Sequence, residues 1–239
     1  KPRIEKLFAG WEPGDVPAKP VSEVAGKREK VLYLVDRPGA DQSVIFVGQL
    51  LPPRNVADDI DIETLNDVLG GQFTARINMN LRETKRWAYG AYSFITEARG
   101  QRLLLAYAPV QTDKTSESLA ELRREFTEIV GARPASDQEV ELVKTINTLS
   151  LPGRWESSSA VLGSVSELVR FGLPDDYWNS YADQVRGVTT AAVNAAGSRY
   201  LRPDELVFVV VGDRAVIEPG LKTLGFHRIQ LLDADGELR

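Results

Sequence analysis

The sequence predicts an α+β fold in which a mainly antiparallel sheet has its helices packed on one face. Apolar, β-rich runs come in hairpin-like pairs joined by short turn-prone stretches. Helical patterns, with apolar residues every three or four positions, are clustered between these pairs. The regular alternation of strand and helix that builds a doubly wound parallel sheet does not occur, so we expect the α+β arrangement.

Six segments are predicted as strands. Residues 31–36 and 42–51 flank the turn-prone stretch RPGAD, and residues 89–98 form a hairpin with 101–110. A short strand of the buried type follows much later, at 205–212, and residues 226–232 form the last strand. We expect all of these strands to lie in one sheet.

Helices are predicted over residues 57–71, 72–87, 114–131, 136–149, 156–171, 175–185, 189–200 and 215–224. In the second of these, Phe73, Ile77 and Leu81 recur at intervals of four, which predicts that all three face the core. Ser136 and Asp213 are predicted to cap the helices that follow them, because their side-chain oxygens can accept from the free backbone N–H groups of the first turn.

Composition limits the classes of protein. The chain has 239 residues, 43% of them hydrophobic and 26% charged, as in an ordered globular protein. A net charge of -5 argues against nucleic-acid binding, which needs a basic surplus. No apolar run approaches the roughly 20 residues of a membrane span. The absence of Cys fits an exported protein, such as a bacterial periplasmic one, as well as a cytosolic one.

Residues 1–29 are rich in Pro, Gly and polar side chains, and they carry no signal peptide. We predict that they are a linker from an upstream domain and that residues 30–239 form one domain. The chain is then expected to be a piece of a longer protein.

The sequence contains few residues or motifs that could catalyse a reaction. Its one histidine, His227, is predicted to be a partly exposed residue of the last strand. A catalytic zinc site takes three protein ligands, which usually include more than one imidazole when Cys is missing. Zinc-peptidase motifs, a nucleophile elbow and phosphate-binding glycine loops are all absent. We therefore predict that the isolated chain binds no catalytic zinc and catalyses nothing.

Arg82 and Tyr89 lie seven positions apart, across the end of the second predicted helix. With Leu81 facing the core, Arg82 turns roughly 100° away from it, and Tyr89 falls where the next strand begins. Both side chains can then point into one cleft, where a guanidinium grips peptide carbonyls and a phenol donates to a developing oxyanion. Arg82 also fits a solvated charge that favours the helix dipole, with Tyr89 as a half-buried strand residue. From the residues alone both interpretations stay open.

The stretch LGGQFTARINMNLRETKRWAYGAYS, residues 69–93, resembles the signature of the C-terminal half-domain in the M16 (pitrilysin or insulinase) family of zinc metalloendopeptidases. That signature reads approximately LGG-x-F-x-S-R-L-x-x-x-L-R-x-x-x-G-x-x-Y-G. The residues that match it are Leu69, Gly70, Gly71, Phe73, Arg76, Leu81, Arg82, Tyr89 and Gly90. Ala75, Ile77 and Arg86 depart from it. Arg86 stands where the family has Gly, so we expect the turn before Tyr89 to be altered.

The likeness extends from about residue 30 to the end, because residues 199–225 are similar to the family's closing helix–strand–helix unit. The sequence INMNLRE, residues 77–83, also resembles the last quarter of the sequence of long tandem bacterial members of the family. The resemblance implies that residues 30–239 form an M16 C-terminal-type domain with the fold of a LuxS/MPP-like metallohydrolase half.

In this family two such halves close around a peptide, and one of them holds zinc in an HxxEH motif. The other half contributes an arginine and a tyrosine that contact the substrate backbone, and Arg82 and Tyr89 match these positions. Gly70 and Gly71 first end a helix, and they are also candidates for letting a peptide backbone approach closely. The resemblance therefore implies no cofactor in this chain and zinc on a partner half, in the same polypeptide or on another subunit.

Three functions stay open. The favoured one is a substrate-binding domain that completes the active site of a zinc metallopeptidase. The second is a non-catalytic scaffold or core subunit of the same fold, which has no need of both Arg82 and Tyr89. The third is an unrelated soluble binding module, which a different fold would establish.

Overall fold

The computed structural model describes residues 1–12, 14–17, 20–26, 29–54 and 57–238. Its strands are β1 (Val31–Asp36), β2 (Gln42–Leu51), β3 (Tyr92–Ile95), β4 (Arg102–Gln111), β5 (Val207–Gly212) and β6 (Arg228–Leu232). Its α-helices are α1 (Pro2–Leu7), α2 (Asp59–Asn66), α3 (Arg76–Asn78), α4 (Thr115–Glu128), α5 (Asp137–Leu149), α6 (Ser158–Phe171), α7 (Tyr177–Gly187), α8 (Thr190–Tyr200) and α9 (Arg214–Leu221). Two π-helical turns, η1 (Asp67–Gly71) and η2 (Met79–Thr84), and three 3₁₀ turns, η3 (Thr112–Lys114), η4 (Leu151–Trp155) and η5 (Lys222–Leu224), complete the described elements.

The strands of the described residues form one six-stranded sheet in the order β3-β4-β2-β5-β1-β6. The pairs β3/β4, β4/β2 and β2/β5 are antiparallel, whereas β1 is parallel to both β5 and β6. This confirms the predicted single, mainly antiparallel sheet and the hairpin of β3 and β4.

β1 and β2 follow one another in the chain but do not pair, so the predicted pairing of these two strands is wrong. β5 lies between them, with Val209 opposite Tyr33 of β1 on one side and Phe46 of β2 on the other. The β5 sequence VFVVVG is apolar over almost its whole length, which suits a central strand whose backbone is paired on both sides.

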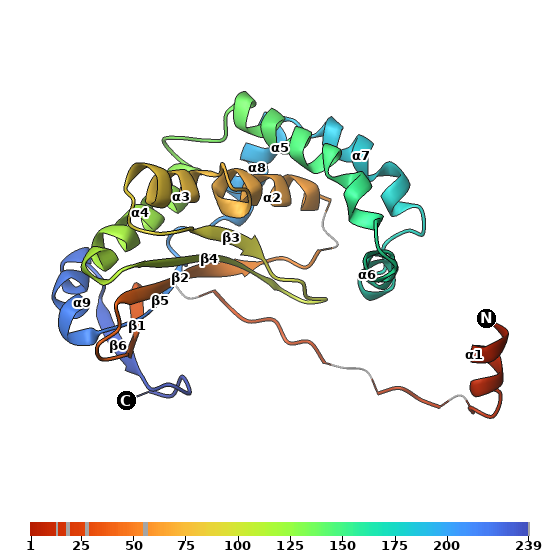
Figure 1. Cartoon of the computed structure of the whole chain (residues 1–239), viewed down its shortest axis with the longest axis horizontal. Helices are drawn as coiled ribbons and strands as arrows, with labels where there is room; N and C mark the ends of the chain where they lie inside the picture. Colours follow the sequence, from red (N-terminus) through yellow and green to blue (C-terminus); the bar gives the residue numbers. More distant parts are fainter. Residues whose placement is uncertain (13, 18–19, 27–28, 55–56, 239) are drawn as a thin grey trace.

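The helices between β2 and β5 lie on one side of the sheet, as predicted, whereas α1 lies apart from it (Figure 1). α4 contacts β2 and β4, and its residues Leu119 and Phe126 are buried. The sheet residues on this face are apolar and in register across the strands, for example Ile45 opposite Val210 of β5 and Ala108 of β4. A sheet covered on one side alternates buried and half-exposed positions, which is the pattern of all three strands.

The predicted caps of α5 and α9 are confirmed. Ser136 and Glu139 form a reciprocal capping box at the start of α5. The Asp213 carboxylate accepts from the backbone N–H of Ala215 at 3.0 Å, at the start of α9. Asp213 also accepts from the N–H of Gly39 at 2.8 Å, which ties α9 to the turn between β1 and β2.

The described residues before β1 lie outside the helical layer (Figure 1). α1 buries none of its residues. Nearer the sheet, the N–H of Val24 donates to Gln101 Oε1 at 2.6 Å, and Gln101 Nε2 donates back to the Val24 carbonyl at 3.0 Å. The chain is thus attached to the β3–β4 hairpin before it enters β1. The linker role of residues 1–29 stays a prediction.

α6 has the reverse of the usual polarity of a surface helix. Its polar residues Ser164 and Glu167 are buried, whereas Leu162, Val165 and Val169 are exposed. The polar side is buried because Glu167 takes part in a network of ion pairs that is described below. No helix within the described part of the chain is both long enough and apolar enough to cross a membrane.

Candidate functional site

All the site residues predicted from the sequence lie on the chain between α2 and β3. This stretch does not contain two continuous α-helices, because the π turns η1 and η2 follow α2 and α3 and the second helix ends at Thr84. Between them, Gln72 and Ala75 have extended backbone with ψ of 158°. The prediction of one helix over residues 72–87 is therefore wrong. Short π-helical turns are rare and are frequent at functional sites.

Phe73 lies in this break, and the prediction that it faces the core is wrong. Its side chain is 55% exposed, whereas Ile77 and Leu81 are buried as predicted. The Phe73 ring instead lies beneath the guanidinium of Arg82, whose Cζ is 4.6 Å from the ring centroid. Phe73 is therefore a support for Arg82.

Arg82 lies on η2, and its side chain is 36% exposed. It points away from the buried Leu81, as the sequence predicts. Its Nε is 3.4 Å from Glu83 Oε1, and no other acceptor among the described residues is bound to its guanidinium. Most of its five N–H donors are thus available to a ligand.

Tyr89 is 86% exposed. It precedes β3 by three residues, so it is not the first residue of a strand, although its neighbour Ala88 forms an isolated bridge with Val110. Its hydroxyl has no hydrogen bond to any described residue, and among the described residues no hydrogen bond or cation–π contact joins Arg82 to Tyr89. The phenol is therefore available to a partner that is not in this chain.

Arg86, between the two, has a φ of 61° in the left-handed region. Its carbonyl accepts from Gln111 Nε2 at 3.3 Å, and the N–H of Gln111 donates to the Trp87 carbonyl at 2.9 Å. The M16 signature that this segment resembles has Gly at this position, and glycine takes this conformation without strain. The turn therefore stays in the region that suits glycine although the residue is arginine.

Gly70 and Gly71 have different surroundings. Gly70 is buried, and a Cβ atom there would lie 2.5 Å from Ser93 Oγ and 2.6 Å from Ser93 N. The close approach that Gly70 permits is therefore that of η1 to β3. Gly71 is exposed, and a Cβ atom there would lie 2.3 Å from Asp67 Oδ1.

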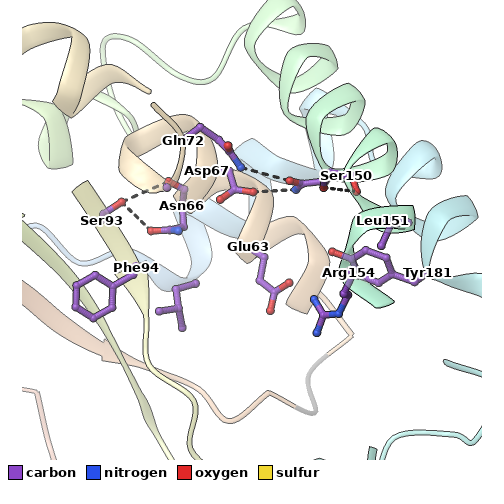
Figure 2. A pocket seen from close by; sticks show the side chains of 13 residues that line it. Glu63, Asn66, Asp67, Gln72, Ser93, Phe94, Ser150, Leu151, Arg154 and Tyr181 are labelled. Carbon is purple, nitrogen blue, oxygen red and sulfur yellow. Dashed lines mark hydrogen bonds between the residues drawn. The ribbon is translucent and has the colours of Figure 1, made fainter. Parts of the chain in front are cut away.

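A cavity of about 430 Å³ opens beside Gly71 (Figure 2). Residues of α2, η1, β3, α5, η4 and α7 line it. On the η1 side, Asn147 Nδ2 donates to Asp67 Oδ2 at 2.8 Å and Gln72 Nε2 donates to Asn147 Oδ1 at 3.3 Å. Glu63 projects into the cavity between Phe94 of β3 and Arg154 of η4.

Ion pairs join the walls around Glu63. Asp59 binds Arg54, with 3.5 Å between Oδ2 and Nε, and it also binds Arg102. Glu167 binds Arg54 Nη1 at 2.5 Å and Arg154 Nη2 at 2.6 Å. The Glu63 carboxylate has no hydrogen bond or ion pair with any described residue.

The protonation of these groups follows from their burial. Burial raises the pKa of Glu63 to about 7, and the neighbouring Asp59 carboxylate adds to the rise. Burial also raises the pKa of Asp59 and of Asp67, although the charge of Arg102 and the hydrogen bond from Asn147 act against it. Glu63 therefore keeps its proton to a higher pH than an exposed glutamate does.

No motif in the sequence marks Glu63 or the cavity that it lines. Arg102, Arg154 and Glu167 are 39, 91 and 104 positions away from Glu63 (102 − 63, 154 − 63 and 167 − 63). Within the described residues, no group of three His, Cys, Asp or Glu side chains is placed to hold a metal ion. His227 is exposed and directly precedes β6.

Residues 1–147 match the family model described as the peptidase M16 inactive domain. The chain belongs to this family. No curated protein matches it. Among solved structures, this M16 inactive domain is similar to the peptidase M16 inactive domain from Pseudomonas fluorescens, with 22% identity, a TM-score of 0.75, and coverage of 83% of this chain and 47% of that one.

Two further structures share the fold. A protease from Helicobacter pylori has 17% identity and a TM-score of 0.74, with 87% of this chain and 50% of that chain covered. The periplasmic protease PqqL from Escherichia coli has 17% identity and a TM-score of 0.68, with 88% of this chain and 24% of that chain covered. The M16 inactive domain thus spans half or less of the length of these three proteins.

Proposed function

We propose that this M16 inactive domain is the substrate-binding domain that completes the active site of a zinc metallopeptidase acting on peptides. The observation that carries the proposal is the half-exposed guanidinium of Arg82, which is stacked on Phe73 within the segment that matches the family signature. Tyr89, on the same segment, presents a hydroxyl that no described residue binds. Two unsatisfied donor groups suit the carbonyl oxygens of an extended peptide.

The two side chains have separate tasks in this proposal. The guanidinium N–H groups of Arg82 donate hydrogen bonds to a substrate carbonyl oxygen and so fix the position of the peptide backbone. Tyr89 donates to the oxygen on which negative charge develops as the scissile carbonyl is attacked. The proposal assigns to Gly71, which is exposed at the rim of the cavity, the approach of a peptide backbone, although the Asp67 carboxylate takes the space of a Cβ atom there. Gly70 keeps η1 close to β3.

Zinc belongs, in this proposal, to a domain with an HxxEH motif, in the same polypeptide or on a partner subunit. Bound there, zinc supplies an activated water for the attack on the peptide. Solved proteins of this fold that are about twice as long as this chain support the existence of such a half. An exported location is part of the proposal, and the periplasmic protease among the similar structures supports it.

The test uses the polypeptide or complex that contains both halves. Arg82→Ala and Tyr89→Phe should each lower kcat by roughly 10²–10³, which is the usual effect of removing one preorganised donor. The zinc content should stay unchanged. Tyr89→Phe keeps the ring, so a loss of turnover there assigns the effect to the hydroxyl.

Two exposed residues of the same types provide the controls. Tyr92→Phe removes a hydroxyl three positions away, and Arg186→Ala removes an arginine whose side chain is 63% exposed on α7. Both should keep wild-type turnover. If the Arg82 and Tyr89 variants also cleave peptide at the wild-type rate, the pair is structural and the domain is a non-catalytic scaffold or core subunit.

A further inference from the structure

Glu63, Asp67 and Arg154 are the charged residues that line the cavity beside Gly71, and further ion pairs lie next to it. Asp59 is paired with Arg54 and Arg102, and Glu167 is paired with Arg54 and Arg154. Asp67 is held by the amide of Asn147, which is neutral. Glu63 alone has neither an ion pair nor a side-chain hydrogen bond among the described residues, although the charges of Arg54 and Arg102 act on it from a distance.

A buried carboxylate is stable only when hydrogen-bonded or paired, and otherwise it takes up a proton. In keeping with this rule, burial and the nearby Asp59 carboxylate raise the pKa of Glu63 to about 7. A cation next to Glu63 would remove the need for the proton, because an opposite charge within about 4–6 Å favours the ionised form.

The surroundings of Glu63 fit a cation at the end of an aliphatic stem. Apolar side chains, Phe94, Ile95 and Leu151, form part of the wall, and the volume of about 430 Å³ is sufficient for one long side chain. Lys and Arg side chains are of this kind, since their methylene stems lie along apolar surface while the charged end seeks polar partners.

A second observation comes from the adjoining cavity of about 170 Å³, which Glu63, Arg154 and Tyr181 also line. There the indole Nε1 of Trp178 is buried and has no acceptor among the described residues. Glu63 is thus an acceptor without a donor, and Trp178 Nε1 is a donor without an acceptor, among the described residues. A peptide residue with a cationic side chain supplies both kinds of group.

We infer that this cavity binds the ammonium or guanidinium group of a lysine or arginine side chain of a peptide, with Glu63 as its counter-ion. The inference rests on the proposed function only for the source of that side chain. It gives the domain a preference for basic peptides that is separate from the backbone contacts of Arg82 and Tyr89.

The test measures binding to the chain itself, with defined probes. The cationic probes are N-acetyl-lysine N-methylamide and its arginine counterpart, and N-acetyl-norleucine N-methylamide is the uncharged probe of similar shape. Binding at pH 8 is followed by isothermal titration calorimetry in the wild type and in the variants, and in the wild type also by NMR shifts of the Glu63 side-chain carboxyl in glutamate-labelled protein. We expect the cationic probes to bind about 10-fold or more tightly than norleucine, because a charge-assisted hydrogen bond is present only with them.

Glu63→Gln should abolish this preference, since the amide keeps the size of the side chain and loses its charge. Glu97→Gln is the matched control, because Glu97 lines the adjoining cavity but its side chain is 59% exposed. In the wild type, a saturating lysine probe should also lower the pKa of Glu63 towards its ordinary value, and this measurement does not depend on any variant folding.

Equal binding of the lysine and norleucine probes, or a preference that survives in Glu63→Gln, would overturn the inference. An absence of binding by every probe would do the same. This test measures binding and not peptide turnover. It can therefore contradict the inference about the cavity without affecting the proposed roles of Arg82 and Tyr89, and the turnover test can contradict those roles without affecting the cavity.

Discussion

Arg86 holds the backbone in the left-handed region, with a φ of 61°. That conformation costs a residue with a Cβ atom about 1–2 kcal/mol, whereas glycine loses roughly 0.4–1 kcal/mol more through chain entropy. We expect Arg86→Gly to raise the free energy of unfolding by about 0.5–1 kcal/mol, measured by urea denaturation. Arg86→Ala keeps the Cβ atom and should give no gain. A glycine variant no more stable than the alanine variant would show that the turn is not strained.

Single residues were predictable where their partners are close in the sequence. Ser136 and Asp213 act on backbone groups two or three positions away, so capping chemistry identifies both. The outward direction of Arg82 follows from the buried Leu81 next to it. The support that Phe73 gives to Arg82 depends on the extended break between η1 and α3, which no helical period reveals. Glu63 was missed for a related reason, because its charged neighbours come from β4, η4 and α6.

At the scale of elements, η1 and β3 approach so closely that a side chain at Gly70 has no room. A Cβ atom there would lie 2.6 Å from the backbone N of Ser93, which cannot move without separating the two elements. We expect Gly70→Ala to lower the free energy of unfolding by about 1–3 kcal/mol in urea denaturation. Gly163 in α6 is the control, because a Cβ atom there meets nothing within 4 Å. Gly163→Ala should stabilise by about 0.5–1 kcal/mol. Equal effects of the two substitutions would show that the η1–β3 contact adapts to a methyl group.

Elements with a strong local pattern were predicted closely. The structure confirms β1 and β2 at the predicted bounds, and α5 begins directly after its predicted cap. The π turns were not predicted, because the wider turn of a π-helix changes the period on which sequence patterns depend. The position of β5 between β1 and β2 was not predicted either, because a strand that is apolar throughout carries no signal for its neighbours. Only packing of the whole sheet decides that order.

For the whole molecule, Glu63 makes stability depend on pH. Its folded pKa of about 7 lies above the ordinary value of 4.5, so the folded state binds more protons than the unfolded state between these values. Stability therefore falls as the pH rises from about 4.5 to above 7, by up to about 3 kcal/mol. We expect Glu63→Gln to remove this slope and to be more stable than the wild type at pH 8, as measured by urea denaturation across the range. A wild-type profile that is flat between pH 5 and pH 8, or a variant with the same slope, would contradict the assignment.

Glu139 acts in the opposite direction at lower pH. Although burial alone would raise it, the hydrogen bond from Arg76 lowers the pKa of Glu139 to about 2. Its contribution is present above the ordinary value of 4.5 and is lost as the pH falls towards 2. The two carboxylates therefore place the most stable conditions for this domain in mildly acidic solution.

The reversed polarity of α6 affects the solubility of the protein. Leu162, Val165 and Val169 form a solvent-exposed apolar stripe along one side of the helix. Hydrophobic association between such stripes on different molecules becomes stronger on warming near room temperature and in sulfate salts. Concentrated samples should therefore become turbid on warming or on addition of sulfate, and the turbidity should reverse on cooling. In dilute solution the net charge of -5 keeps the molecules apart.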